Sequence, residues 1–219
     1  MRTADGRTHT IRNVIWDVDG TLFDTYPAIA RAFQAALADL GADDSLERIA
    51  DLARVSLDHC ATTLTADHRL DAGTFEDAFS RHYASTTPDE QPPFPGAKAI
   101  CRHIDRIGGR NVIVTHRGAQ GTAELLAASH LTASFSGCIT AADGYPRKPD
   151  PAAFNALIER RGLSRDQTLA IGDREIDVLA GRAAGVVTCL FGRADPATVA
   201  DLVVTDFADL LRLLEAPDR

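Results

Sequence analysis

The sequence is poor in three features that would each narrow its function: closely spaced cysteines, excess positive charge and long apolar runs. Its 219 residues include four cysteines, and no two of them form a CxxC pair or another metal-ligand spacing. We therefore expect buried, reduced thiols, which argues against a disulfide framework and against a zinc site. The four cysteines are Cys60, Cys101, Cys138 and Cys189.

The balance of charge is acidic. Lys and Arg number 23 against 31 Asp and Glu, for a formal net charge of −8. Because a nucleic-acid backbone is bound by clustered Lys and Arg, we do not expect a nucleic-acid partner. A site for a phosphate group would have to collect its positive charge locally, from a metal ion, a lysine and backbone amides.

Long apolar segments are also missing. No run approaches the about 20 residues of a membrane span, and residues 1–6 lack the apolar centre of a signal peptide. We therefore expect a cytoplasmic location and no membrane partner. No GxGxxG follows a predicted strand, which disfavours a dinucleotide-binding protein.

The most informative segment is DVDGTLFD, residues 17–24, which directly follows the apolar run of residues 11–16. The pattern predicts a buried strand that ends on two carboxylates, Asp17 and Asp19, followed by Gly20. Open α/β sheets place their chemistry at the carboxyl ends of the strands. A first carboxylate can attack phosphorus, and a second can protonate the leaving oxygen.

Three later segments carry polar side chains at predicted strand ends or helix starts. Residues 111–115 form an apolar strand that ends on a hydroxyl, residues 147–151 place a lysine before a helix, and residues 170–177 contain GDxxxD after a strand. The side chains concerned are Thr115, Lys148, Asp173 and Asp177.

Together the four motifs resemble those of the haloacid dehalogenase-like (HAD) hydrolase superfamily. Within it, the chain is similar to the branch of phosphoglycolate phosphatases and β-phosphoglucomutases, which carry a helical cap after the first strand, and the resemblance covers nearly the whole chain. It implies a Mg²⁺-dependent phosphatase that hydrolyses phosphomonoesters of small metabolites, phosphoglycolate-like or sugar-phosphate-like, through an aspartyl-phosphate. The partner would be a small phosphorylated metabolite, and the protein a monomer or homodimer. A β-phosphoglucomutase-like phosphomutase and a non-catalytic regulatory module of the same fold remain as alternatives.

The resemblance also implies roles for individual residues. Asp17 would be the nucleophile, Asp19 the general acid and base, and Lys148 the group that neutralises charge. Phosphate contacts are implied for Thr115, His116, Arg117 and Lys148. The implied Mg²⁺ ligands are Asp17, Asp19 through its backbone carbonyl, Asp173 and Asp177. His116, Arg117 and Arg174 depart from the residue types that are common at their positions, so their contacts stay open.

Strand and helix patterns divide the chain into two parts. Residues 1–24 and 95–219 are expected to form a Rossmann-like catalytic core, an α/β doubly wound parallel sheet with right-handed crossovers. Residues 25–94 show only helical periodicity and are expected to form an inserted all-helical cap. Closure of such a cap would complete the site, and its candidates for contact with substrate are Arg54, His59 and Cys60.

Particular residues predict where helices begin. Asp44 with Glu47 and Thr74 with Asp77 have the spacing of capping boxes, and Asp150 before Pro151 has that of an N-cap followed by a first-turn proline. The predicted strands cover residues 11–16, 111–115, 136–140, 168–172, 186–191 and 202–205.

Overall fold

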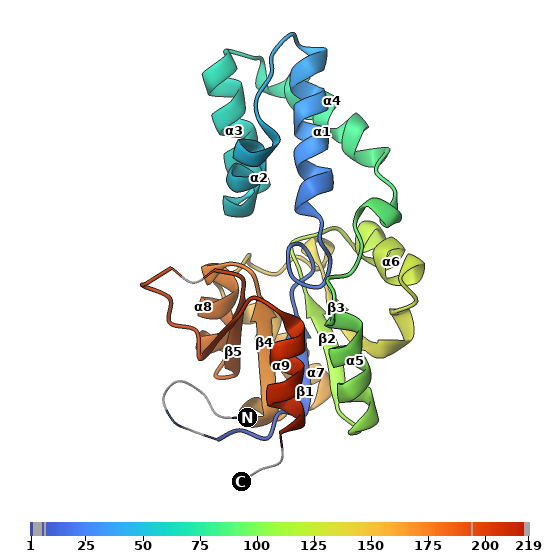
Figure 1. Cartoon of the computed structure of the whole chain (residues 1–219), viewed down its shortest axis with the longest axis vertical. Helices are drawn as coiled ribbons and strands as arrows, with labels where there is room; N and C mark the ends of the chain where they lie inside the picture. The colour runs from blue at the N-terminus through green and yellow to red at the C-terminus, as the bar shows by residue number, and fades with distance from the viewer. Residues whose placement is uncertain (2–5, 7, 194, 217–219) are drawn as a thin grey trace. The chain divides into compact units, whose positions relative to one another are not determined.

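The computed structural model describes residues 1, 6, 8–193 and 195–216 (Figure 1). The chain divides into two compact units, Met1–Phe23 with Pro93–Arg219, and Asp24–Pro92. The first unit contains a sheet with helices, and the second contains helices α1 to α4, inserted after the first strand.

A six-stranded parallel sheet forms the first unit, in the order β3-β2-β1-β4-β5-β6. The chain places β2 and β3 on one side of β1 and then β4, β5 and β6 on the other side. The strand order therefore reverses between β1 and β4. The predicted doubly wound parallel sheet is therefore confirmed. The strands are β1 (Asn13–Trp16), β2 (Arg110–Val114), β3 (Phe135–Ile139), β4 (Thr168–Gly172), β5 (Val187–Phe191) and β6 (Leu202–Val204).

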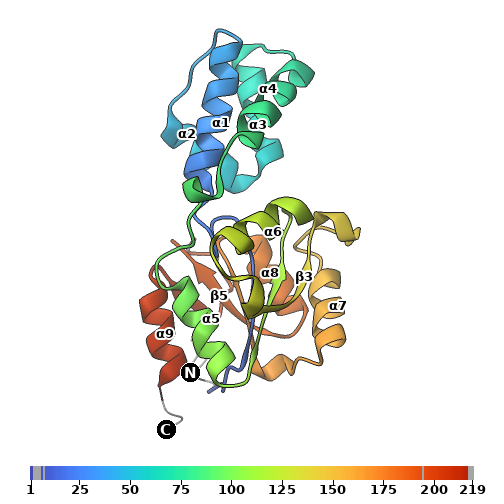
Figure 2. The same cartoon turned by 90° about the vertical axis from the view of Figure 1, so that its right-hand side faces the viewer.

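Helices cover both faces of this sheet (Figure 2). On one face Trp16 of β1 packs in an apolar cluster with α5, α6 and α9, whereas its neighbour Ile15 points into a second cluster with α7 and α8. This alternation follows from the two-residue period of a strand and explains why β1 and β4 are buried along their whole length. The helices are α5 (Ala97–Arg106), α6 (Ala119–Ala128), α7 (Ala152–Arg161), α8 (Glu175–Ala183) and α9 (Phe207–Glu215).

The inserted unit has an apolar core of its own. The rings of Phe33 and Phe79 stack with their centroids 3.9 Å apart, and Phe79 in turn stacks on Tyr83. These residues join α1 to α4, and Ile49 and Leu64 close the core from α2 and α3. The helices are α1 (Tyr26–Asp39), α2 (Leu46–Val55), α3 (Leu57–His68) and α4 (Ala72–Ala84).

All three predicted helix starts differ from the structure. Helix α7 begins at Ala152 with Pro151 as its N-cap, although Asp150 Oδ1 still accepts from Ala152 N at 2.8 Å. The N-cap of α2 is Ser45, whose hydroxyl accepts from Arg48 N at 3.2 Å, and the N-cap of α4 is Asp71, whose carboxylate accepts from Thr74 N at 2.9 Å. Several polar residues precede each helix, and any of them can cap it, so spacing alone does not select one.

Helix α9 was not predicted. Asp206 accepts from Ala208 N at 2.7 Å as its N-cap, and Phe207 stacks on Phe191 with centroids 4.0 Å apart. The apolar spacing of Phe207, Leu210 and Leu214 after an N-cap aspartate was an available signal. The prediction of four buried thiols also fails at one position, because Cys138 is exposed on the edge strand β3.

Within the described ranges, no helix combines the length and the apolar character that crossing a membrane would need. Four short 3₁₀ turns complete the described secondary structure: Pro88–Glu90, Thr132–Ser134, Ala141–Asp143 and Arg165–Gln167.

A substitution at Gly109, directly before β2, tests how closely the backbones of β1 and β2 approach each other. A Cβ at this position would lie 1.7 Å from the carbonyl oxygen of Arg12, so the backbones must separate to admit a side chain. We expect Gly109→Ala to lower the free energy of unfolding by about 2–4 kcal/mol in urea denaturation. Gly118→Ala is the matched control, because a Cβ at Gly118 would have no atom within 4 Å apart from its two chain neighbours. Equal stability of the two variants would contradict this account.

Candidate active site

Three polar residues directly follow strands that lie side by side. Asp17 follows β1, Thr115 follows β2 and Asp173 follows β4. Trp16 of β1 is in register with both Ile113 and Ile171 of its two neighbours, so the strands end together. The chain segments of the four predicted motifs therefore meet at the carboxyl edge of the sheet, next to the point where the strand order reverses.

Lys148 connects these segments through a buried ammonium group. Its Nζ donates to Asp17 Oδ1 at 2.6 Å, to Asp177 Oδ1 at 2.5 Å and to the carbonyl oxygen of Val114 at 3.1 Å. The side chain of Lys148 is 1% exposed, and those of the two aspartates are 4% and 3% exposed. An ammonium ion is tolerated in such a place only when its charge and its donors are all matched, and here they are.

Burial and charge act in opposite directions on these groups. Burial raises the pKa of Asp17 to about 6, with Asp177 adding to the rise and Lys148 acting against it. Burial tends to lower the pKa of Lys148, but Asp17 and Asp177 outweigh it, so that the pKa is raised. At neutral pH Lys148 is therefore cationic, and Asp17 is an ionised carboxylate able to act as a nucleophile.

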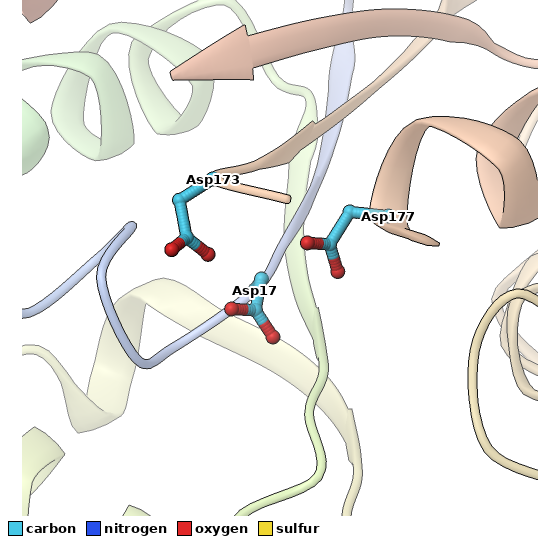
Figure 3. A group of neighbouring side chains, drawn as sticks. All are labelled: Asp17, Asp173 and Asp177. Carbon is cyan, nitrogen blue, oxygen red and sulfur yellow. The ribbon is translucent and has the colours of Figure 1, made fainter. Parts of the chain in front are cut away.

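Asp17, Asp173 and Asp177 form a group that can hold a metal ion. One carboxylate oxygen from each lies within 4.8 Å of the others, and Figure 3 shows the three side chains gathered from the ends of two strands and the start of α8. Asp17 Oδ2 is buried and has no hydrogen-bond partner in the described part of the chain, so an oxygen is available for a cation. A set of carboxylate oxygens suits Mg²⁺, a hard cation. The side chain of Asp19 lies outside this group.

Local structure explains the GDxxxD pattern around Asp177. Its Oδ2 accepts from Arg174 N at 3.2 Å and caps α8, while Oδ1 binds Lys148. A Cβ on Gly172 would lie 2.2 Å from Cβ of Asp177, so only glycine admits this approach. Arg174 Nε lies 4.0 Å from Asp173 Oδ1, beside the carboxylate group.

Asp19 is bound by Arg117 from the loop after β2. Arg117 Nη2 donates to Asp19 Oδ1 at 2.6 Å, and Nε donates to Oδ1 at 3.0 Å and to Oδ2 at 3.3 Å. The Arg117 side chain is 10% exposed, so it is not a solvated surface arginine. Asp19 lies in the loop after β1, so this ion pair connects the loops that follow β1 and β2.

His116 and Thr115 complete the loop after β2. His116 Nε2 accepts from Lys148 N at 2.9 Å, and Thr115 Oγ1 accepts from Arg117 N at 3.1 Å. Burial, together with the charge of Lys148, lowers the pKa of His116 to about 4, so its ring is neutral at neutral pH. The neutral ring is what allows Nε2 to accept this bond and hold the Lys148 backbone.

The three residues considered for substrate contact lie in the inserted unit. Cys60 is fully buried, and its Sγ donates to the carbonyl oxygen of Ile49 at 3.7 Å, which argues against contact with a substrate. Arg54 lies over the ring of Tyr26, with 5.3 Å between its guanidinium carbon and the ring centroid. Arg54 and His59 are exposed, and their contact with substrate stays a prediction.

Comparison with known proteins agrees with this geometry. The family model of haloacid dehalogenase-like hydrolases matches residues 14–191. The phosphoglycolate phosphatase of Yersinia pestis is 31% identical over 221 residues, which cover 94% of each chain. That of Cupriavidus necator is 32% identical over 215 residues, covering 93% of this chain and 91% of the relative.

A solved structure has the same fold. The crystal structure of a predicted phosphoglycolate phosphatase from Haemophilus somnus superposes with a TM-score of 0.83 at 22% identity, covering 96% of this chain and 100% of the other. Six parallel strands with a helical insert after β1 therefore form an α/β architecture already known from a solved structure. The chain belongs to the haloacid dehalogenase-like hydrolase family, as its motifs predict.

Removal of the Lys148 ammonium tests the electrostatics of the site. In Lys148→Met, Asp17 and Asp177 face each other without a cation, and we expect the free energy of unfolding in chelator to fall by about 3 kcal/mol or more. Lys98→Met, at the only other lysine in the sequence, is the control and should change stability by less than about 0.5 kcal/mol. Urea denaturation measures both, and a similar effect in the two variants would contradict the proposed charge balance.

Proposed function

We propose that this hydrolase is a Mg²⁺-dependent phosphatase that cleaves phosphomonoesters of small metabolites through an aspartyl-phosphate on Asp17. The observation that carries the proposal is the buried Lys148, whose ammonium binds an ionised Asp17 at the carboxyl edge of the sheet. This arrangement gives a nucleophile together with the positive charge that a phosphate dianion needs in an acidic protein.

In the first step an Asp17 oxygen attacks phosphorus. The bond from phosphorus to the ester oxygen breaks, its electron pair stays on that oxygen, and the proton of Asp19 converts the leaving alkoxide into an alcohol. Thr115 and Lys148 are the proposed donors to the phosphoryl oxygens. Both side chains are buried, and Lys148 binds Asp17 directly, which favours strong electrostatic stabilisation because solvent screens buried charges weakly.

In the second step water attacks the phosphorus of the aspartyl-phosphate. Asp19 accepts a proton from this water, the bond to the Asp17 oxygen breaks, and inorganic phosphate leaves. Both carboxyl groups are thereby returned to their starting state. Asp17, Asp173 and Asp177 would hold Mg²⁺, with the backbone carbonyl of Asp19, and the ion supplies charge that offsets the negative phosphate.

The proposed substrate is phosphoglycolate or a small sugar phosphate. Support comes from the phosphoglycolate phosphatases to which the chain is about 30% identical across nearly its whole length. Fold alone hosts many substrates, so the assignment is tested with a panel of phosphorylated metabolites.

The panel assay measures phosphate release from phosphoglycolate, sugar phosphates and nucleoside monophosphates. We expect Mg²⁺-dependent release from phosphoglycolate or a sugar phosphate, and a loss of at least about a thousandfold in kcat in Asp17→Asn while the variant stays folded, as its circular dichroism spectrum would report. Asp58→Asn, at an exposed position in α3, should keep full activity. Transfer of labelled phosphate from a bisphosphate to a second sugar hydroxyl would point instead to a phosphomutase. Inactivity on every compound would favour a regulatory module.

Metal binding can be measured without turnover. We expect Mg²⁺ at about 100 times its Kd to stabilise the protein by about 2.7 kcal/mol, seen as a rise of several degrees in melting temperature. Asp173→Asn should lose most of this rise, whereas Asp58→Asn should keep it. An unchanged rise in Asp173→Asn would show that the ion binds elsewhere.

A further inference from the structure

We infer that Arg117 is a positioning residue for Asp19, holding its carboxylate so that Oδ1 is engaged and Oδ2 is presented for proton exchange. This inference rests on the acid–base role proposed above for Asp19. Arg117 would then be the second basic residue of the active site. Asp17 is paired with Lys148, and Asp19 is paired with Arg117.

The hydrogen bonds of the pair are unequal. Asp19 Oδ1 accepts from Nη2 at 2.6 Å and from Nε at 3.0 Å, whereas among the described residues Oδ2 accepts only the 3.3 Å bond from Nε. Both strong bonds therefore fall on one oxygen, which leaves Oδ2 as the atom with acceptor capacity to spare. The Arg117 side chain is 10% exposed and that of Asp19 is 27% exposed, so the pair is partly buried. Its geometry is therefore more fixed than that of an ion pair on the open surface.

The backbone of Arg117 is fixed at both of its polar groups. Its N–H donates to Thr115 Oγ1 at 3.1 Å, and its carbonyl oxygen accepts from Ala141 N at 3.1 Å. On the other side, the Asp19 loop closes on itself, because Gly20 N donates to the carbonyl oxygen of Phe23 at 2.9 Å. The guanidinium thus joins two anchored loops, and its reach sets the direction of the carboxylate.

Gly121 leaves room for this side chain. A Cβ at Gly121 would lie 3.3 Å from Arg117 Nη1 and 3.8 Å from its Cδ. Glycine inside a helix such as α6 costs about 1 kcal/mol relative to alanine, so this position needs a steric reason. At Gly118, three residues earlier, such a Cβ would have no atom within 4 Å apart from its two chain neighbours, Arg117 and Ala119, so the position offers a comparison.

The chemistry of a guanidinium limits what Arg117 can do. It does not exchange protons near neutral pH, so it cannot replace Asp19 as acid or base. Its contribution is the orientation of Oδ2, and orientation matters in proportion to how much the leaving group needs a proton. An alkoxide needs one, whereas a nitrophenolate leaves without it.

The test compares kcat/KM for nitrophenyl phosphate, hydroxyethyl phosphate and phosphoglycolate, because kcat/KM reports the steps through transfer of the phosphoryl group to Asp17. In Arg117→Ala we expect the loss with hydroxyethyl phosphate to exceed the loss with nitrophenyl phosphate by at least about tenfold. Arg117→Lys should recover part of the difference, since it restores the charge without the two-pronged geometry. Gly121→Ala should give a smaller difference of the same sign between the two losses in kcat/KM, and Gly118→Ala should give no difference.

Other outcomes would overturn the inference. An equal loss with both substrates, with or without a lower melting temperature, would mean that Arg117 contacts the phosphoryl group or supports the fold. A loss with phosphoglycolate but not with hydroxyethyl phosphate would mean that it binds the carboxylate of the substrate. If the wild-type protein released phosphate from none of the three compounds, the proposed phosphatase function would itself fail, and the inference with it.

Discussion

The Lys148 ammonium, buried between the carboxylates of Asp17 and Asp177, is the interaction on which the rest of the site depends. It joins the loop before α7 to the ends of β1 and β2 and to the start of α8. Without a cation, the negative charges of Asp17, Asp173 and Asp177 would repel one another in a largely buried region, where solvent screens charge weakly. The lysine therefore allows the acidic residues to converge, and it also keeps the attacking carboxylate in place.

Sheet topology supplies the convergence that this interaction uses. Asp17 and Lys148 are 131 residues apart in the chain, yet they meet because β1 lies between β2 and β4 and all strands run parallel. Two apolar clusters, one on each face, hold the strands in register. Gly172 has a similar role at close range, because any side chain there would displace Asp177 from the lysine.

The two carboxylates with proposed chemical roles differ in their surroundings. Asp17 is almost completely buried with a buried partner, whereas Asp19 is about a quarter exposed and paired with Arg117. This difference fits their proposed tasks. A nucleophile gains from a shielded, fixed position, while a residue that meets first a leaving alcohol and then water must remain accessible. Because Asp17 and Asp19 lie in such different surroundings, each is paired with a cation of its own, Lys148 for Asp17 and Arg117 for Asp19.

By itself the sequence determined the six strands, the helical insert and the polar residues that follow β1, β2 and β4, because strand and helix periodicity and the residues that bound apolar runs are local properties of the chain. Among competing caps it did not distinguish Ser45 from Asp44, since both can accept the same bonds. Only the tertiary structure decided that Arg117 pairs with Asp19, that His116 holds the Lys148 backbone and that Asp177 both caps α8 and binds Lys148. Such contacts depend on the reach of side chains between loops far apart in sequence, and no local pattern records that distance.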